Sequence, residues 1–147
     1  MACELVGAYE EAQQAYGGLV ESEQYAGIAK VRLGGVLACL GDSESGRRMI
    51  EETVAADTSL RPLAAWVCQN AGQALSDANK PEDAVLLYQI AAAYSPEDPF
   101  PWLKTGEMLQ RMGKTADALA AYRHLIQIDA TSAPAMEAAR QIDVMLN

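Results

Sequence analysis

The side chains that could carry out catalysis or bind a metal are few, and they follow no recognised pattern. The sequence contains one histidine, His124, and three cysteines, Cys3, Cys39 and Cys68, without a C-x-x-C spacing. A structural zinc site takes about four such ligands, and the chain has no G-x-S-x-G, P-loop or H-E-x-x-H motif. We therefore predict no enzymatic activity, no metal site and no cofactor. Cys39 and Cys68 fall on helical apolar patterns and are expected to pack as small core residues.

The charged residues make the chain acidic without gathering in one half of it. The formal net charge is −9, with five Lys or Arg against ten Asp or Glu in residues 1–73 and six against ten in residues 74–147. No basic face is expected, so nucleic acid and anionic membranes are poor candidates for a partner. No apolar run approaches the roughly 18 residues of a membrane span, so we also predict no membrane insertion.

The first twenty residues do not have the composition of a secretory signal. They contain Glu4, Glu10 and Glu11 and lack a basic leader followed by an apolar core. Three cysteines without a pairing pattern favour a reducing compartment. We predict a cytoplasmic protein, and a periplasmic location is the alternative if an upstream signal has been removed.

The remaining chemistry is that of binding, and it depends on a 34-residue pattern that occurs twice between Ala65 and Ser132. The matching positions are Gly72 and Gly106, Leu75 and Leu109, Ala84 and Ala118, and Tyr88 and Tyr122. A fixed period of this length indicates stacked helix–turn–helix units. Asn79 and Gly113 should end the first helix of each unit in a left-handed conformation, and Pro81 suits the first turn of the helix that follows.

Small residues are expected where the two helices of a unit cross. We predict that Gly72 on the first helix faces Ala84 on the second, and that Gly106 faces Ala118. A larger side chain at such a crossing would overpack it and cost about 1–3 kcal/mol. Trp102 is expected to fill a wider gap and to be buried.

The rest of the chain fits around these two copies as one domain. The predicted division of residues 1–147 is a leading helix at 3–20, repeats at 27–60, 65–98 and 99–132, and a closing helix at 133–146. Terminal units of such stacks are commonly atypical because they cap the core.

Three details follow from the residues between and within these units. The four extra residues 61–64 should lengthen the first helix of the middle unit, with Ser59 as its N-cap. Gly46 lies mid-helix, which costs up to about 1 kcal/mol, so the first unit should be the softest. The closing helix should be capped by Thr131 and Ser132, and its expected inward residues are Met136, Ala139, Ile142 and Met145.

The better copy of the pattern resembles a known repeat. It reads Trp102-x-x-Thr105-Gly106-x-x-Leu109 and then Ala118-x-x-x-Tyr122, which is similar to the tetratricopeptide repeat (TPR). The resemblance implies an all-α, right-handed TPR superhelix of three helix–turn–helix repeats with a leading helix and a closing helix. It also implies a non-catalytic module that binds an extended peptide or a helix of a partner protein in its concave groove.

The positions that would line this groove combine apolar anchors with amides that could satisfy a peptide backbone. They are Ile28, Val31 and Gly35 in the first repeat, Trp66, Gln69, Asn70 and Gln73 in the second, Phe100, Leu103, Glu107 and Gln110 in the third, and Glu137 and Gln141 in the closing helix. Trp66 or Phe100 could instead pack on a neighbouring helix. Some TPR proteins grip a C-terminal carboxylate in this groove, and only Asn70 and Lys104 fit that pattern here, so that role is disfavoured.

A narrower resemblance covers residues 99–113. Pro99-Phe100-Pro101-Trp102, followed by Glu107-Met108-Leu109 and Gly113, is similar to the third repeat of the class II translocator chaperones of type III secretion. Those are small acidic cytoplasmic proteins that hold an extended segment of a translocator. The alternative is a fragment of a larger bacterial TPR scaffold, of a periplasmic envelope-assembly kind, that self-associates. Apolar groove residues would then serve a homodimer.

Overall fold

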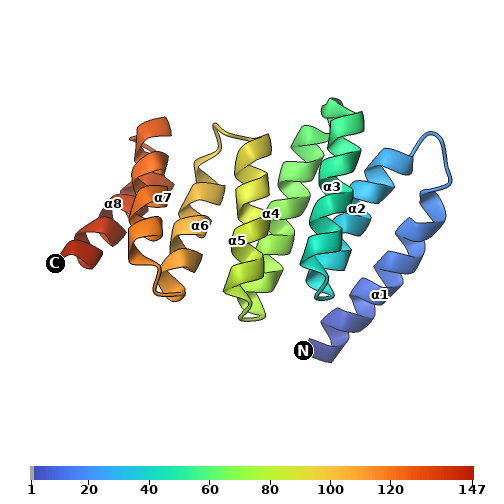
Figure 1. Cartoon of the computed structure of the whole chain (residues 1–147), viewed down its shortest axis with the longest axis horizontal. Helices are drawn as coiled ribbons and strands as arrows, with labels where there is room; N and C mark the ends of the chain where they lie inside the picture. The colour runs from blue at the N-terminus through green and yellow to red at the C-terminus, as the bar shows by residue number, and fades with distance from the viewer. Residues whose placement is uncertain (1) are drawn as a thin grey trace.

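The computed structural model describes residues 2–147, with side chains from Glu10 onward. Within that range the chain forms eight α-helices, one 3-10 helix and no strand (Figure 1). The helices are α1 (Ala2–Leu19), α2 (Ala26–Cys39), α3 (Ser43–Ala56), η1 (Thr58–Leu60), α4 (Arg61–Asp77), α5 (Pro81–Tyr94), α6 (Pro99–Arg111), α7 (Thr115–Ile128) and α8 (Ala133–Leu146). The predicted all-α chain with a leading helix, three helix pairs and a closing helix is confirmed.

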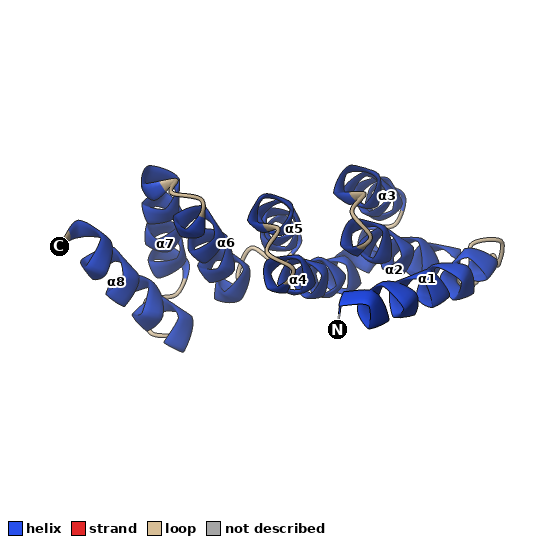
Figure 2. Cartoon of the chain, turned by 90° about the horizontal axis from the view of Figure 1, so that it is seen from below, coloured by secondary structure: helices blue, strands red, loops and turns tan. Residues whose placement is uncertain are grey.

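The helices stand side by side in one elongated stack. The three pairs are α2 with α3, α4 with α5, and α6 with α7, while α1 packs on α2 and α8 packs on α7 and α6. Seen along the helices, α3, α5 and α7 lie on one side of the stack, and α2 and α4 lie on the other (Figure 2). We call the surface formed by α2, α4 and α6, continued by α8, the first-helix face. The surface formed by α3, α5 and α7 is the second-helix face.

Each first helix ends at a residue with positive φ, as the pattern predicts. The φ angles are 105° at Gly41, 59° at Asn79 and 73° at Gly113. After α4, the Lys80 N–H donates to the Leu75 carbonyl at 2.8 Å, and the Asn79 N–H donates to the Ser76 carbonyl at 3.0 Å. These two bonds satisfy carbonyl groups that the helix end leaves free. The same arrangement after α2 and α6 gives the three pairs the same tight turn.

The glycines at the helix crossings make room for tyrosine rings. A Cβ at Gly72 would lie 3.0 Å from the Tyr88 ring, and a Cβ at Gly106 would lie closer still to the Tyr122 ring. Both tyrosines are fully buried. The nearest side chain to Gly72 is therefore Tyr88, which lies one turn further along the second helix than the predicted Ala84.

The first pair crosses through two glycines. A Cβ at Gly34 would lie 2.8 Å from the Gly46 carbonyl oxygen and 2.6 Å from the Ile50 Cγ1, and a Cβ at Gly46 would lie 2.9 Å from the Ala38 nitrogen. The close packing of α2 on α3 therefore requires a residue without a side chain at position 46. The prediction from helix propensity, that Gly46 weakens its helix, does not include this packing role.

Helix starts confirm one expectation and correct another. The extra residues do lengthen the middle first helix, because α4 has 17 residues against 14 in α2 and 13 in α6. Ser59 is not its N-cap: it lies in η1, where its N–H donates to the Asp57 carboxylate at 3.1 Å, and α4 starts after Leu60 without a side-chain cap. The closing helix is capped by Ser132, whose hydroxyl accepts from the Ala135 N–H at 3.2 Å.

The buried stripe of α8 is offset from the predicted one. Ala135 and Ala138 are buried, whereas Met136 is 63% exposed. Of the predicted inward residues, Ile142 and Met145 do pack against the core. The predictions for Met136 and Ala139 are wrong, because both side chains are exposed.

The cysteine prediction is confirmed where the structure describes it. Cys68 is fully buried, and Cys39 is half-buried against the same core. The pKa of the Cys68 thiol is raised to about 12, mainly because the thiol is buried and to a smaller extent because of the negative charge of Glu51. The Cys3 side chain lies outside the described residues.

Candidate partner-binding surface

A row of exposed apolar side chains crosses the first-helix face. Ile28, Trp66 and Phe100 occupy equivalent positions on α2, α4 and α6. Their exposures are 41%, 55% and 37%, which place them among the most exposed large apolar residues described. Trp66 contacts Arg32 of α2, yet more than half of its surface remains accessible. The row is the apolar part of the predicted surface.

One helical turn further along each helix lies a second, polar row, in which two cations stand over the aromatic rings. The row is formed by Arg32 on α2, Asn70 on α4 and Lys104 on α6. The Arg32 guanidinium lies 5.5 Å from the centroid of the Trp66 ring, and the Lys104 Nζ lies 5.5 Å from that of Phe100. Cation–ring contacts at such distances are attractive and hold both groups in place.

The predicted amides lie on this face, and most of them bond to neighbouring side chains. Gln69 donates to Asp98 at 2.8 Å. The remaining bonds are Gln73 to Asp77 at 2.9 Å, Tyr88 to Gln73 at 3.3 Å, Tyr122 to Gln110 at 3.0 Å, and Gln141 to Glu137 at 2.7 Å. An amide has two N–H donors and an oxygen with two lone pairs, so each of these groups keeps capacity for a partner.

Two tyrosines support these amides from beneath. Burial, followed by the charges of Glu107 and Glu137, raises the pKa of Tyr122 to about 12. Burial also raises the pKa of Tyr88. Both hydroxyls therefore stay protonated at neutral pH and donate to Gln110 and Gln73, which orients the amides.

Three residues predicted to line the groove lie in the packed interior. Val31 is fully buried, and Leu103 is 8% exposed. Gly35 is also buried, and a Cβ there would lie 2.5 Å from Val67 Cγ1 on α4. The predictions for Val31 and Leu103 are corrected, because these buried side chains support the surface from below. Gly35 is buried but lines a hollow of this face between α1, α2 and α4.

Helix α1 contributes Tyr16 to the end of the first-helix face that lies beside α2, which the sequence did not predict. A hollow of about 170 Å³ lies between α1, α2 and α4. It is lined by Tyr16, Arg32, Cys39, Trp66 and Asn70, together with four small or apolar neighbours. Arg32 was also missed, although it is the first-repeat equivalent of Asn70 and Lys104 and the repeat register could have identified it.

The other end of the face is polar. A hollow of about 450 Å³ is lined by Ser76, Glu107, Met108, Gln110, Arg111 and Gln141. Beside it, hydrogen bonds from Arg140 and then Gln141 lower the pKa of Glu137 to about 2. The predicted residues Glu107, Gln110, Glu137 and Gln141 are thus brought together where α6 meets α8.

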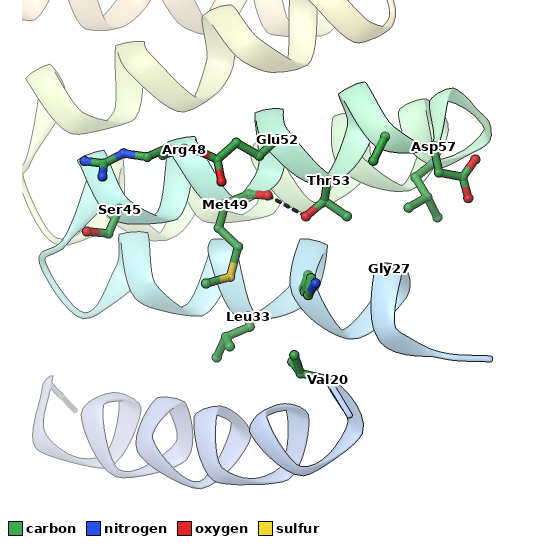
Figure 3. A pocket seen from close by; sticks show the side chains of 12 residues that line it. Val20, Gly27, Leu33, Ser45, Arg48, Met49, Glu52, Thr53 and Asp57 are labelled. Atoms are coloured by element: carbon green, nitrogen blue, oxygen red, sulfur yellow. Dashed lines mark hydrogen bonds between the residues drawn. The ribbon is translucent and has the colours of Figure 1, made fainter. Parts of the chain in front are cut away.

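Larger hollows lie away from this face. Figure 3 shows one of about 650 Å³ between the end of α1, α2 and α3, with Val20, Leu33 and Met49 among its lining residues. Another, of about 590 Å³, lies between α5, α6 and α7 and includes Trp102 and His124.

Trp102 is only partly buried, which corrects the predicted full burial. Its ring centroid lies 4.2 Å from that of the exposed His124. Its indole N–H is shielded and has no hydrogen-bond partner among the described residues. The ring still packs against the core.

Two further kinds of feature do not occur in the part of the chain that the structure describes. No group of three or more His, Cys, Asp or Glu side chains there is placed to hold a metal ion. None of the described helices combines the length and the apolar character that crossing a membrane requires.

Three stacked helix pairs between a leading and a closing helix are the architecture that the TPR resemblance predicts, and solved structures of a TPR protein share this fold. Structures of MamA, a TPR protein, match over most of the chain. One entitled "Crystal structure of MamA" is 19% identical, with a TM-score of 0.53, and the match covers 95% of this chain and 81% of that one. "Crystal structure of MamA protein" is 19% identical, with a TM-score of 0.51, and the match covers 95% of this chain and 82% of that one. "MamA RS-1 ArsTM double mutant" is 20% identical, with a TM-score of 0.51, and the match covers 85% of this chain and 68% of that one.

At this level of identity the comparison establishes the fold alone. No protein-family model matches the chain, and no curated protein sequence matches it significantly. What the fold is used for must therefore be argued from the surface itself.

Proposed function

We propose that this chain is a non-catalytic protein-binding module whose first-helix face holds an extended segment or a helix of a partner protein. The observation that carries the proposal is the row of Ile28, Trp66 and Phe100, which exposes apolar surface at equivalent positions of three successive helices. Aromatic side chains that are rigid and accessible are typical binding anchors. The repeats at 27–60, 65–98 and 99–132 are proposed as the units that present them.

The polar groups beside this row support binding of a protein segment. Gln69, Asn70 and Gln73 lie within two turns of Trp66 on α4, so they can meet a partner backbone next to the anchor. Amides both donate and accept, which suits a peptide group that does the same. A translocator-chaperone role would be one case of this binding, and it rests on the resemblance of residues 99–113 and of the whole-chain architecture, which is a leading helix, three repeats and a closing helix.

Self-association is the second candidate, and a separate observation favours it. On the last helix, Met136 is 63% exposed, Val144 60% and Leu146 59%. Exposed apolar side chains gathered on one helix often mark contacts with another molecule. A homodimer formed through these side chains of α8 would leave the row of Ile28, Trp66 and Phe100 available.

A site-specific cross-linking experiment tests the proposed surface. Asn70 is exposed beside Trp66, so a photoreactive benzoylphenylalanine at position 70 should label a partner in the organism that encodes the chain. The matched control carries the same group at Arg123, which is exposed on α7 of the second-helix face. Labelling from position 70 that is lost on Trp66→Ala is the expected result. Equal labelling from both positions would contradict the proposal.

A further inference from the structure

The cations of this acidic chain are distributed unevenly between the two helix classes. Helices α2, α4 and α6 together hold five Lys or Arg against two Asp or Glu, and α8 adds one against two, whereas the rest of the chain holds five against sixteen. Of these cations, Lys30 lines the hollow between α1, α2 and α3, away from the first-helix face. The two halves of the sequence have nearly the same charge, so this separation was not visible along the chain. We infer that the partner of the first-helix face is an acidic segment of a protein, with Asp or Glu side chains next to apolar ones. This inference rests on the proposed binding function of that face.

Arg32 is the cation best placed to receive such a carboxylate. It forms no ion pair with any described carboxylate, and its guanidinium carbon lies 5.5 Å from the centroid of the Trp66 ring. A guanidinium has five N–H donors, and a contact with a ring engages none of them with an oxygen, so they remain available to a carboxylate of a partner. An apolar side chain on Trp66 and a carboxylate on Arg32 would therefore be bound side by side.

Two other cations extend the same preference along the face. Arg111 donates to two neutral oxygens, Ser76 Oγ and Asn79 Oδ1, both at 3.0 Å, and pairs with no described carboxylate. Lys104 stands over Phe100 and is partly neutralised by Glu107 at 2.9 Å. Each cation thus lies near an apolar anchor or a polar hollow of the face, with at most one acid to compete with a partner.

The apolar row distinguishes an acidic protein segment from a nucleic acid. A polyphosphate backbone needs several cations in line, and the strong net negative charge of the chain opposes a long polyanion. A protein segment with two or three carboxylates suits a few isolated cations among apolar side chains. Charge complementarity of this kind sets partner choice and association rate.

Selection from a random peptide library tests the inference on the full chain. Segments of 12 residues are displayed between two folded domains, so that no free C-terminal carboxylate is presented. Clones that bind the wild-type chain but not Trp66→Ala are sequenced. We expect these clones to contain more Asp and Glu than the unselected library, and their binding to weaken as salt rises.

One selected segment is then made as a peptide with both ends blocked and titrated calorimetrically. Arg32→Glu should weaken binding about tenfold and Arg32→Gln about threefold. The matched control Arg123→Glu, on the second-helix face, should change the Kd less than about twofold.

The outcomes separate this inference from the proposed function. Trp66-dependent clones without an excess of acids, or an Arg32→Glu chain that binds as well as wild type, would overturn the acidic preference and leave the binding function standing. A library that yields no Trp66-dependent clone would contradict both the acidic preference and the proposed binding function. Displacement of the bound peptide by equimolar single-stranded DNA would replace the acidic protein segment with a nucleic acid, and so would also overturn the inference.

Discussion

Replacing Gly46 with alanine tests the close crossing of α2 and α3. The new Cβ would meet the Gly34 carbonyl oxygen and lie 2.9 Å from the Ala38 nitrogen. Both are backbone atoms of α2, so no side chain can rotate to relieve the contact. The two helices must separate, and overpacking of this kind costs about 1–3 kcal/mol.

Helix propensity acts in the opposite direction. Alanine is favoured over glycine inside a helix by up to about 1 kcal/mol. Because the contact at Gly46 involves backbone, the overpacking cost should lie in the upper part of its range. The net loss of unfolding free energy is then about 1–2 kcal/mol, which corresponds to a fall in Tm of about 2–8 °C for a chain of this size.

Gly17→Ala provides the matched control. Gly17 also lies in a helix, α1, but a Cβ there would have no atom within 4 Å. Only the propensity gain applies, so this variant should be as stable as wild type or slightly more so. Urea unfolding followed by circular dichroism at 222 nm compares the three proteins. A Gly46→Ala chain as stable as Gly17→Ala would refute the close crossing of α2 and α3.

Four further outcomes are expected. Trp66→Ala should weaken partner binding at least about 30-fold by titration, because losing a central aromatic anchor costs about 2 kcal/mol or more; an unchanged Kd would remove the anchor role. Ala118→Leu should lower the unfolding free energy by about 1–3 kcal/mol in the same urea assay, since Ala118 is fully buried. The pKa of Tyr122 is raised to about 12 in the folded state, so its stabilising contribution is complete below pH 10 and is lost as the pH rises towards 12; Tyr122→Phe should flatten the fall in Tm over that range. The Cys68 thiol, whose burial raises its pKa to about 12, should react with a thiol reagent at pH 8 only after unfolding, and rapid reaction of the native chain would contradict its burial.

The fold was predictable because its signals are local. The 34-residue period and the residues with positive φ at Asn79 and Gly113 follow from backbone requirements that recur in every pair. Pro81 likewise opens α5 because the first turn of a helix needs no N–H at that position. Signals of this kind do not depend on how one pair packs on the next.

The surface was predictable only in part, because exposure depends on packing between pairs. Val31 and Trp66 both fall on the side of their helices that the register assigned to the groove. Val31 is fully buried, while Trp66 is 55% exposed. Val31 and Leu103 share one repeat position and are both buried, whereas Ile28, Trp66 and Phe100 share another and are all exposed. Which position a neighbouring pair covers depends on packing between pairs, as where Gly35 of α2 admits Val67 of α4.

The junction between the first two pairs also explains why Trp66 is a well-positioned anchor. Helix α5 packs broadly on α6, whereas α3 barely touches α4, so the first junction depends on contact between α2 and α4. The four additional residues at the start of α4 place Trp66 inside a helix of 17 residues, with regular backbone on both sides. Phe100, by contrast, is the second residue of α6. An anchor whose backbone is already ordered loses less entropy when a partner binds, so the partner-binding energy should be concentrated at Trp66.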